Sequence, residues 1–561
     1  MFKNLRPEYA LMGVVGLLTV GLVSYPVVFL VQVSLNAGNP QDKPIKVWGV
    51  NNYAGIFDHL DWLWNSITVS AVGTVGAVIF GLVLAWIINR TTVPGRRVFE
   101  QLVIIPFYVT PIVGALAWSL LGSPKSGIIN KAFQTLSGTN VTLINAESWL
   151  GIAWVEALYE GSVAFVMISA AMKSMDPALE ESSEVLGAGR LHTALRVTIP
   201  MLTPAVLGAA IFVFVALMGS FSAAVILGFP ARFYVVTTAI WMLLARFPAN
   251  YPLAAAMGIS LFAFTAGSMA LYYFVIRGKT YTTITGKAFR PRLIDMRGWT
   301  PVLFGVCCFY VLVAVVLPIG SLIYVSFLKF PTTVLKDIHW TLYNYDWVLI
   351  KHAPTRIALS NSLLLAVATA TIGIVFMGIL AWMINRTNIR GRHILDYVAM
   401  FPQAVPRMVF SLGLLWAWIV MPIGVYGSLW ILLLCYLTVF LPLGVRAISG
   451  VVVQLDKSVE ECARVCGASW VHTLRTVTLP LLRPGVMAAW VLIFIVAIRE
   501  IGGSILLISA KSKVIGPAII ETWESSGMQL TSALVLVQTA VILIALLIAG
   551  KVAGKRFEEM E

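Results

Sequence analysis

The chain has little charge for its length. Asp, Glu, Lys and Arg together make up 11% of its 561 residues, whereas 59% are hydrophobic. A soluble protein of this size carries far more charge on its surface. Uncharged apolar stretches of about 20 residues recur along the sequence, which is the length of a membrane-spanning helix and twice that of a barrel strand. The sequence therefore predicts an all-α polytopic membrane protein.

Cysteine is also scarce, with five residues in the whole chain. Cys307, Cys308 and Cys435 fall in apolar stretches, whereas Cys462 and Cys466 fall in a polar segment. None lies in a predicted outer loop, so no disulfide framework is expected. Cys462 and Cys466 share a helical face, but two thiols without further Cys or His at ligand spacing make a poor metal site. We expect no metal site in the chain.

Signatures of catalysis and of nucleotide binding are missing as well. A phosphate-binding P-loop needs the pattern G-x-x-x-x-G-K-[ST] after a strand. The nearest match is Gly278-Lys279-Thr280, but Tyr273 stands in place of the first glycine. The six histidines are scattered and form no metal-binding or nucleophile-activating pattern. We therefore expect no catalytic residue and no cofactor in this chain, and a membrane enzyme is disfavoured.

The formal net charge of +14 follows the pattern of a membrane protein. Lys and Arg concentrate in alternate loops between the apolar stretches, as the positive-inside rule requires. This distribution argues against nucleic-acid binding and places both termini in the cytoplasm. The N-terminal stretch after Lys3 and Arg6 is too long for a signal peptide and lacks a small-residue cleavage site, so we interpret it as the first span.

Twelve apolar stretches are long enough to span a bilayer. We expect spans at 9–34, 63–88, 99–121, 148–172, 204–227 and 251–276, and then at 299–327, 361–384, 395–421, 428–449, 486–508 and 530–550. Two further segments, 232–247 and 514–525, are too short to span, and we expect re-entrant or outer-surface helices there.

An internal repeat relates the two halves. Residues 84–96 (LAWIINRTTVPGR) match 380–392 (LAWMINRTNIRGR) at nine of 13 positions, and residues 176–204 match 456–484 at 13 of 29 without a gap. The matches include Asn, Arg, His, Glu, Gly and Pro, so shared apolar composition does not explain them. Because each half has an even number of spans, the sequence predicts two parallel six-helix repeats. They comprise residues 1–280 and 299–561, joined by a basic cytoplasmic linker at 281–298.

The polar segments 176–204 and 456–484, called the first loop and the second loop below, have a common predicted design. Asp176 is a suitable N-cap, and Pro177 suits the first helical position. Gly187 is expected to end this helix in a left-handed conformation. Pro200 then opens the next span after a second short helix. A short rigid helix held between two spans can transmit motion from a docked soluble partner.

The spacing of Glu, Gly and Pro in these loops resembles the EAA loop of permease subunits in bacterial ABC importers. The sequence departs from the family pattern at the two small residues after the glutamate, which are Ser182-Ser183 in one copy and Cys462-Ala463 in the other, and both pairs remain small. Two such loops in one chain resemble the fused permeases of type I importers, and the resemblance covers essentially the whole chain. The residues that carry the match, with the glutamates preceding them, are Glu180, Glu181, Gly187, Pro200, Glu460, Glu461, Gly467 and Pro480.

This resemblance implies a set of partners. In the family the loop forms a coupling helix that fits a groove on an ABC ATPase subunit, so two copies of the ATPase are expected on the cytoplasmic face. ATP and Mg²⁺ would be bound by that ATPase and not by this chain. A periplasmic solute-binding protein is expected on the outer face, against loops such as 35–60, 122–147 and 328–360. The implied location is the bacterial inner membrane.

Details of the sequence resemble the ferric-iron permeases of that family, chiefly at 149–181 and 496–509. The resemblance implies import of ferric iron by alternating access. Thiamine, 2-aminoethylphosphonate and polyamine permeases have a similar architecture and remain open as alternatives. Nothing in the chemistry of the residues decides between these substrates.

Charged residues inside spans are costly and mark functional candidates. Two interpretations stay open: these residues line the translocation path, or they lock helices together as ion pairs. The candidates are Glu156, Glu160, Arg407, Arg499 and Glu500.

A proton-coupled secondary transporter is the main rival, because twelve spans in two parallel halves also describe the major facilitator architecture. Asn89-Arg90 and Asn385-Arg386, each followed after four further residues by Gly-Arg, faintly resemble a signature of that family. The spacing carries extra residues, and that family has no Gly-hinged helical loop before its fifth and eleventh spans.

Overall fold

The fold is taken from a computed structural model, which describes residues 7–40, 42, 44–176, 178–276, 293–330, 338–387, 391–420 and 424–558. Most of the basic linker at 281–298, and Pro177, therefore lie outside the described residues. The described part is helical, and its strand-type pairing is limited to three isolated bridges, Asn36–Trp48, Thr91–Ile294 and Leu328–Trp340.

The helices of the first half, in chain order, are α1 (Pro7–Ser34), α2 (Asn51–Ala54), η1 (Phe57–His59), α3 (Leu60–Arg90), α4 (Arg96–Tyr108), α5 (Pro111–Gly122), α6 (Ile128–Ser137), α7 (Trp149–Ser174), α8 (Ala178–Val185), α9 (Arg190–Thr193), η2 (Ala194–Thr198), α10 (Ile199–Met218), η3 (Ala224–Gly228), α11 (Phe229–Ala231), α12 (Val236–Ala245) and α13 (Tyr251–Ile276).

Those of the second half are η4 (Arg297–Trp299), α14 (Thr300–Val311), η5 (Leu312–Val316), α15 (Leu317–Ser326), α16 (Tyr343–Asp346), η7 (Trp347–Lys351), α17 (Ala353–Arg386), α18 (Arg392–Met400), η8 (Phe401–Gln403), α19 (Arg407–Val420), α20 (Leu429–Val439), α21 (Leu441–Gln454), α22 (Lys457–Val465), α23 (Trp470–Thr473), η9 (Leu474–Thr478), α24 (Leu479–Ile498), α25 (Ile515–Ser526) and α26 (Met528–Glu558).

The all-α polytopic membrane fold is confirmed, but the number of spans is not. Among the described residues, nine helices are long and apolar enough to cross a membrane, and the number rises to 13 if each of four bent helix pairs forms one span. The predicted count of twelve lies between these limits.

Three of the predicted spans are wrong as single helices. Within 99–121, α4 and α5 meet at 96°, and within 395–421 the break before α19 is 101°. Proline explains both breaks, because Pro111 and Pro406 lack a backbone N–H and disfavour a helical conformation in the residue before them. The span predicted at 428–449 is bent by 50° between α20 and α21.

The short segments predicted at 232–247 and 514–525 are helices α12 and α25. Each helix begins with a backbone N–H that is hydrogen-bonded to a serine of an earlier helix. The backbone N–H of Val236 donates to Ser66 Oγ at 2.8 Å, and that of Ile515 donates to Ser362 Oγ at 2.7 Å. The spans before them end early, because α10 stops at Met218 and α24 at Ile498 instead of continuing to 227 and 508.

The chain folds into two compact units that do not follow the sequence repeats. The unit that contains the first loop comprises residues 56–242 and 260–344, and the unit that contains the second loop comprises 1–55, 243–259 and 345–561. They are called the first-loop unit and the second-loop unit below. Helix α1 thus packs on α19 within the second-loop unit, and α15 packs on α5 within the first-loop unit. The boundaries 1–280 and 299–561 stay a prediction about the sequence repeat.

Small residues bring α3 and α7 together in the first-loop unit. A Cβ atom added to Gly81 would lie 2.6 Å from Ala164 Cβ, and one added to Gly76 would lie 2.8 Å from Ala157 Cβ. Glycine and alanine let helix backbones approach closely, which is how helices associate where lipid removes the hydrophobic driving force. In the second-loop unit, Gly413 has the same role, since an added Cβ would lie 2.2 Å from the Pro26 carbonyl oxygen.

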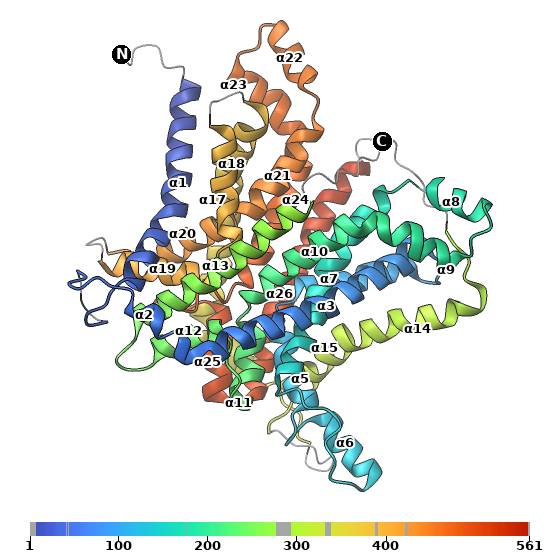
Figure 1. Cartoon of the computed structure of the whole chain (residues 1–561), viewed down its shortest axis with the longest axis vertical. Coiled ribbons are helices and arrows are strands. Elements are labelled where there is room, and N and C mark those ends of the chain that lie inside the picture. The colour runs from blue at the N-terminus through green and yellow to red at the C-terminus, as the bar shows by residue number, and fades with distance from the viewer. Residues whose placement is uncertain are drawn as a thin grey trace. The chain divides into compact units, whose positions relative to one another are not determined.

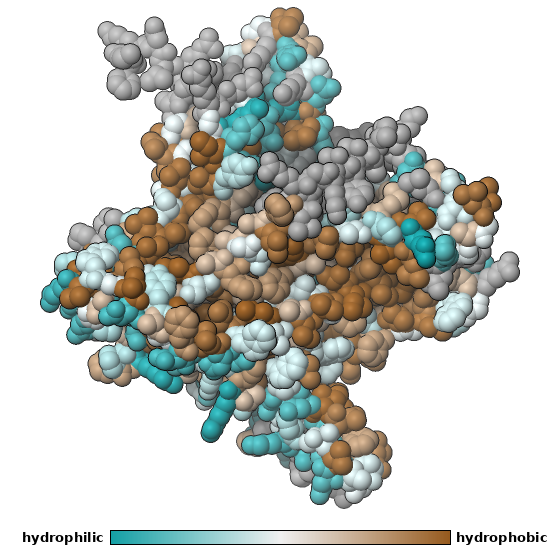
Figure 2. Space-filling model, viewed as in Figure 1, coloured by the Kyte–Doolittle hydropathy of each residue, from teal (hydrophilic) through white to brown (hydrophobic). Residues whose placement is uncertain are grey.

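Another face of α3 is apolar and exposed. Val72, Val75, Ile79 and Val83 recur every three or four residues and are 39–59% accessible. Figure 2 shows hydrophobic residues spread over the flank formed by α3 and α10. An exposed stripe of this kind suits contact with lipid rather than with water.

Candidate partner-docking site

The first loop contains a short capped helix that ends in a glycine turn. Asp176 Oδ1 accepts from the backbone N–H of Ala178 at 2.9 Å, so the predicted N-cap is formed. Gly187 has φ +86°, and the N–H of Ala188 donates to the Ser183 carbonyl at 3.1 Å. This bond, with a left-handed glycine before it, is a Schellman C-cap. In Figure 1, α8 and α9 lie at the end of α3 and α7.

The second loop folds in the same way. Asp456 Oδ1 accepts from the N–H of Ser458 at 2.9 Å, and this hydrogen bond lowers the pKa of the Asp456 carboxyl. Gly467 also has φ +86°, and the N–H of Ala468 donates to the Ala463 carbonyl at 3.1 Å. Helices α22 and α23 stand at the end of α17 and α21 (Figure 1). The predicted duplication of helix, glycine turn and helix is therefore present in three dimensions.

A π turn follows the second short helix in both loops and directs a threonine toward a glutamate. Thr198 in η2 donates to Glu180 Oε1 at 2.7 Å, and Thr478 in η9 donates to Glu460 Oε1 at 3.1 Å. Single π turns inside α-helices are frequent at functional sites. Pro200 and Pro480 then lie in the first turn of α10 and α24, which continue directly from the π turns.

The paired glutamates of each loop have different environments. Glu180 is buried and Glu460 is half-buried, and both bond inward, whereas Glu181 and Glu461 are exposed. The tip of α8 also presents large apolar side chains, with Val185 87% and Leu186 88% accessible, and Val465 of the second loop is 88% accessible. Apolar side chains held out on a capped helix suit insertion into a groove of a partner.

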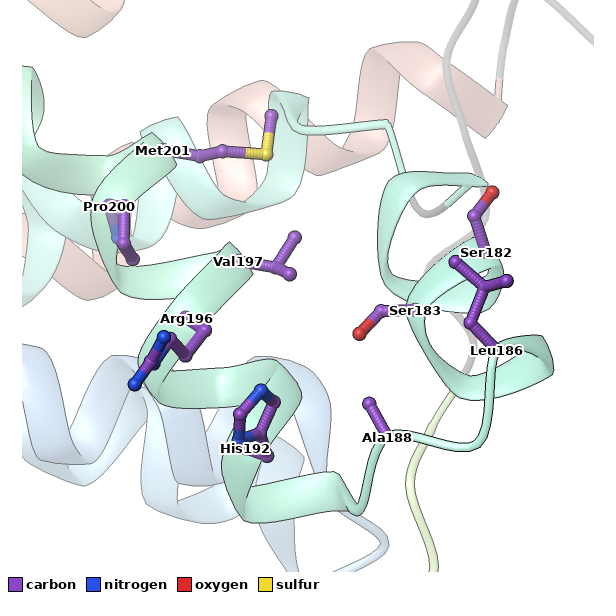
Figure 3. Close-up of a pocket in the computed structure, with 9 residues that line it drawn as sticks. All are labelled: Ser182, Ser183, Leu186, Ala188, His192, Arg196, Val197, Pro200 and Met201. Carbon is purple, nitrogen blue, oxygen red and sulfur yellow. The ribbon is translucent and has the colours of Figure 1, made fainter.

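A hollow of about 630 Å³ lies between α8 and the segment formed by α9, η2 and the start of α10 in the first loop. Figure 3 shows the Ser183 side chain of α8 pointing toward the segment that carries His192 and Val197, with Ala188 on the connection between them, and Leu186 also lines the hollow. Its other lining residues are Ser182, Arg196, Pro200 and Met201. The sequence did not indicate this hollow, because it depends on the angle between α8 and α9.

Arg407 and Glu500, two of the predicted path residues, form an ion pair in the second-loop unit. Arg407 Nη1 donates to Glu500 Oε2 at 2.7 Å, and the N–H of Gly503 donates to Glu500 Oε1 at 2.8 Å. The Glu500 side chain is 1% accessible, whereas that of Arg407 is about half exposed. Arg499 caps the end of α24 next to this pair.

Glu156 and Glu160, the other two, lie one turn apart on α7 in the first-loop unit. Glu156 is buried and accepts a hydrogen bond from the Ser220 hydroxyl, and Glu160 is half-buried. The two candidate sets belong to different units. Whether these five residues line a path therefore stays a prediction.

The comparison with known families identifies the chain. A family described as binding-protein-dependent transport system inner membrane component matches residues 60–281 and 373–558. The chain belongs to this family. The two matched stretches contain the two loops, which agrees with the internal repeat. The permease family predicted from those loops is thus confirmed, and the protein is a multi-pass permease of the inner membrane.

Two curated permeases resemble it along most of its length. The putative ferric transport system permease protein FbpB 1 of Haemophilus influenzae is 28% identical over 80% of this chain and 69% of its own length. The ferric transport system permease protein FbpB of Actinobacillus pleuropneumoniae is 27% identical over 85% of this chain and 68% of its own. Among solved structures, a bacterial ABC transporter that imports alginate is 19% identical with a TM-score of 0.37, over 45% of this chain and 88% of that one.

The site of this permease contains one further residue, which was not among those predicted from the sequence. Arg90, at the end of α3, has its Nε 3.5 Å from Glu180 Oε1 in the first loop. The signal was present, because Asn89-Arg90 and Asn385-Arg386 lie in the most strongly repeated segment of the sequence. Its link to the loop was not visible, since the two residues are 90 positions apart.

Proposed function

We propose that this permease imports ferric iron, driven by two ABC ATPase subunits that bind the first and second loops. The observation that carries the proposal is that the same capped helix and glycine turn are built twice, with exposed apolar residues at the tip of each. Permeases named for ferric transport resemble the chain over most of its length, which supports iron as the cargo.

The loops are suited to receive force from the ATPase. A groove on the ATPase can reach the exposed side chains of each loop, which are Glu181 and Val185 in the first and Glu461 and Val465 in the second. Glu180 and Glu460 instead bond inward and hold α8 and α22 to the permease. ATP and Mg²⁺ bind to the ATPase, because no P-loop occurs in this sequence. Both loops and both termini are then cytoplasmic, in agreement with the positive-inside distribution of Lys and Arg.

Closure of the ATPase pair on ATP pulls the two loops together and favours the outward-facing state. Hydrolysis and release favour the inward-facing state, from which the iron leaves. This is alternating access, in which a partner shifts the population of two states through its different affinity for each. The path must release what it passes, so weak or multiple contacts with the cargo are expected in place of a tight site.

A periplasmic binding protein would deliver the iron at the outer loops. Two of these loops have the same rigid construction, which supports them as a docking surface. Asn52 Nδ2 donates to the Ser34 and Asn36 carbonyls at 3.0 and 2.7 Å, and Asn344 Nδ2 donates to the Ser326 and Leu328 carbonyls, both at 2.8 Å.

The test is reconstitution of the permease with a candidate ABC ATPase and a candidate periplasmic binding protein from the same organism. We expect the three proteins to copurify. We also expect proteoliposomes to take up radiolabelled ferric iron only when ATP is supplied on the side of the membrane that carries the ATPase. A binding protein that carries thiamine, 2-aminoethylphosphonate or a polyamine when isolated, with no iron uptake, would contradict iron as the cargo. Iron uptake that follows a proton gradient without ATP would contradict the ATP-driven mechanism.

A further inference from the structure

Arg90 is buried at the end of α3 with a carboxylate as its main partner. Its side chain is 1% accessible, its Nε lies 3.5 Å from Glu180 Oε1, and its Nη2 donates to the Met172 carbonyl at 3.3 Å. Within the described part of the chain, Nε and Nη1 have no hydrogen-bond acceptor. A buried guanidinium needs a compensating charge, and Glu180 supplies it.

Glu180 in turn connects three elements. It belongs to α8, it faces Arg90 of α3, and it accepts from Thr198 of the π turn η2 at 2.7 Å. Next to Arg90, Asn89 Nδ2 donates to Ser169 Oγ on α7 at 2.6 Å. The end of α3 is thereby attached both to α7 and to the docking helix.

The second loop has no such connection. Arg386, which occupies the same place in the repeat, donates through Nη2 to the Val452 carbonyl at 2.7 Å and to the Leu455 carbonyl. Both carbonyls precede α22. Glu460 keeps its bond from Thr478, but no ion pair between Arg386 and Glu460 is found among the described residues. The arginine therefore holds the chain before the helix here, and not the helix itself.

We propose that Arg90 and Glu180 are positioning residues that fix α8 rigidly to α3, whereas α22 is held to α17 more loosely. The first loop then follows movements of α3 and α7 directly, and the second follows with more freedom. The inference rests on the proposed role of both loops in binding the ATPase, and it makes the two ATPase docking sites mechanically unequal.

Paired spin labels test the rigidity on the permease alone. In a background with the five native cysteines replaced by alanine, one pair is Val185→Cys with Ile79→Cys, from α8 to α3. The matched control pair is Val465→Cys with Val375→Cys, at the same positions of the repeat. All four native side chains are exposed. We expect a narrower distance distribution for the first pair than for the second in the purified full chain.

Substitution of the glutamates then separates the two loops. Glu180→Gln should broaden the Val185–Ile79 distribution. Glu460→Gln keeps an oxygen that can accept from Thr478, so it should broaden the Val465–Val375 distribution less. Equal effects in both loops, or no effect in the first, would overturn the proposal. Because Glu180→Gln leaves a buried arginine without a countercharge, the double variant Arg90→Met with Glu180→Met controls for folding. It should regain thermal stability and keep the broad distribution, and a return to the narrow distribution would also overturn the proposal.

Transport by the reconstituted complex gives the functional readout. Glu180→Gln should lower the iron carried per ATP hydrolysed by about tenfold, within the usual range of coupling between sites. Glu460→Gln should lower this ratio less than Glu180→Gln does. If the wild-type complex carries no iron at all, the proposed function fails, whereas the spin-label result still decides the positioning role.

Discussion

Single residues of the two loops act through the backbone conformation that they permit. Gly187 and Gly467 have φ +86°, and a Cβ added to either would meet no atom within 4 Å. Their requirement for glycine is therefore conformational and not steric. This much could be predicted from the sequence, because a glycine between two short helical segments depends on local chemistry alone.

We expect Gly187→Ala to destabilise the end of α8 by about 1–2 kcal/mol, the cost of a side chain in the left-handed region. Hydrogen–deuterium exchange of the peptide covering 178–188 should then be about 5- to 30-fold faster. Gly189→Ala is the matched control, since Gly189 has equal space and lacks the positive φ. Equal exchange rates in the two variants would show that the turn tolerates alanine.

The Arg407–Glu500 pair allows a decision between the two interpretations of the intramembrane charges. If the pair locks helices, Arg407→Met strands the buried Glu500 and should lower the free energy of unfolding by about 3–5 kcal/mol. Arg446→Met is the control, because Arg446 is exposed and lies 3.4 Å from Asp396, which is itself more accessible than Glu500, so the change should alter stability by only about 0–1 kcal/mol. Unfolding in detergent measures both. Full stability together with lost iron uptake would instead place Arg407 on the path.

Whole helices were predicted well where they are straight and poorly where they bend. The spans that became α3 and α7 follow from apolar length alone. The breaks before α5 and α19 could not be placed, because proline is tolerated inside many membrane helices and only packing decides whether it ends one. The contact of Arg90 with Glu180 also depends on packing and could not be predicted from the sequence, because it requires the end of α3 to lie next to a loop that is distant in the sequence.

The α3–α7 contact gives a prediction at the level of elements. Gly81→Ala puts a methyl group 2.6 Å from Ala164 Cβ and 2.8 Å from backbone atoms of α7, which cannot rotate away. We expect a loss of about 1–3 kcal/mol of stability from overpacking, measured by thermal unfolding in nanodiscs. Gly320→Ala in α15 has free space around it and should be neutral. A neutral Gly81→Ala would mean that α3 and α7 are less closely packed than described.

At the scale of the whole molecule, each compact unit contains segments from both sequence repeats. The sequence predicted two repeats correctly as a pattern of residues, but not that α1 packs on α19 or α15 on α5. This exchange of helices between the two units leaves no trace in the periodicity of the sequence, because an apolar helix has the same residue pattern whichever helix it packs on.

This exchange predicts the behaviour of a divided chain. Residues 1–286 and 287–561, expressed together as two polypeptides, should assemble into a complex that takes up iron, because every helix contact remains available. Either piece alone should aggregate, since each lacks part of both units. Size-exclusion chromatography with a tag on one piece measures the assembly. A folded, monodisperse single half would contradict the exchange.

The different attachment of α8 and α22 has an evolutionary consequence. When a transporter is built from two copies of one polypeptide, each mutation appears in both copies at once, so the two sides must remain identical. Here a single gene encodes both sides in separate stretches, and Arg90 and Arg386 could acquire different partners. Fusion of the two halves thus allows selection to act separately on the residues of each half, which is not possible in a symmetric transporter with two identical subunits.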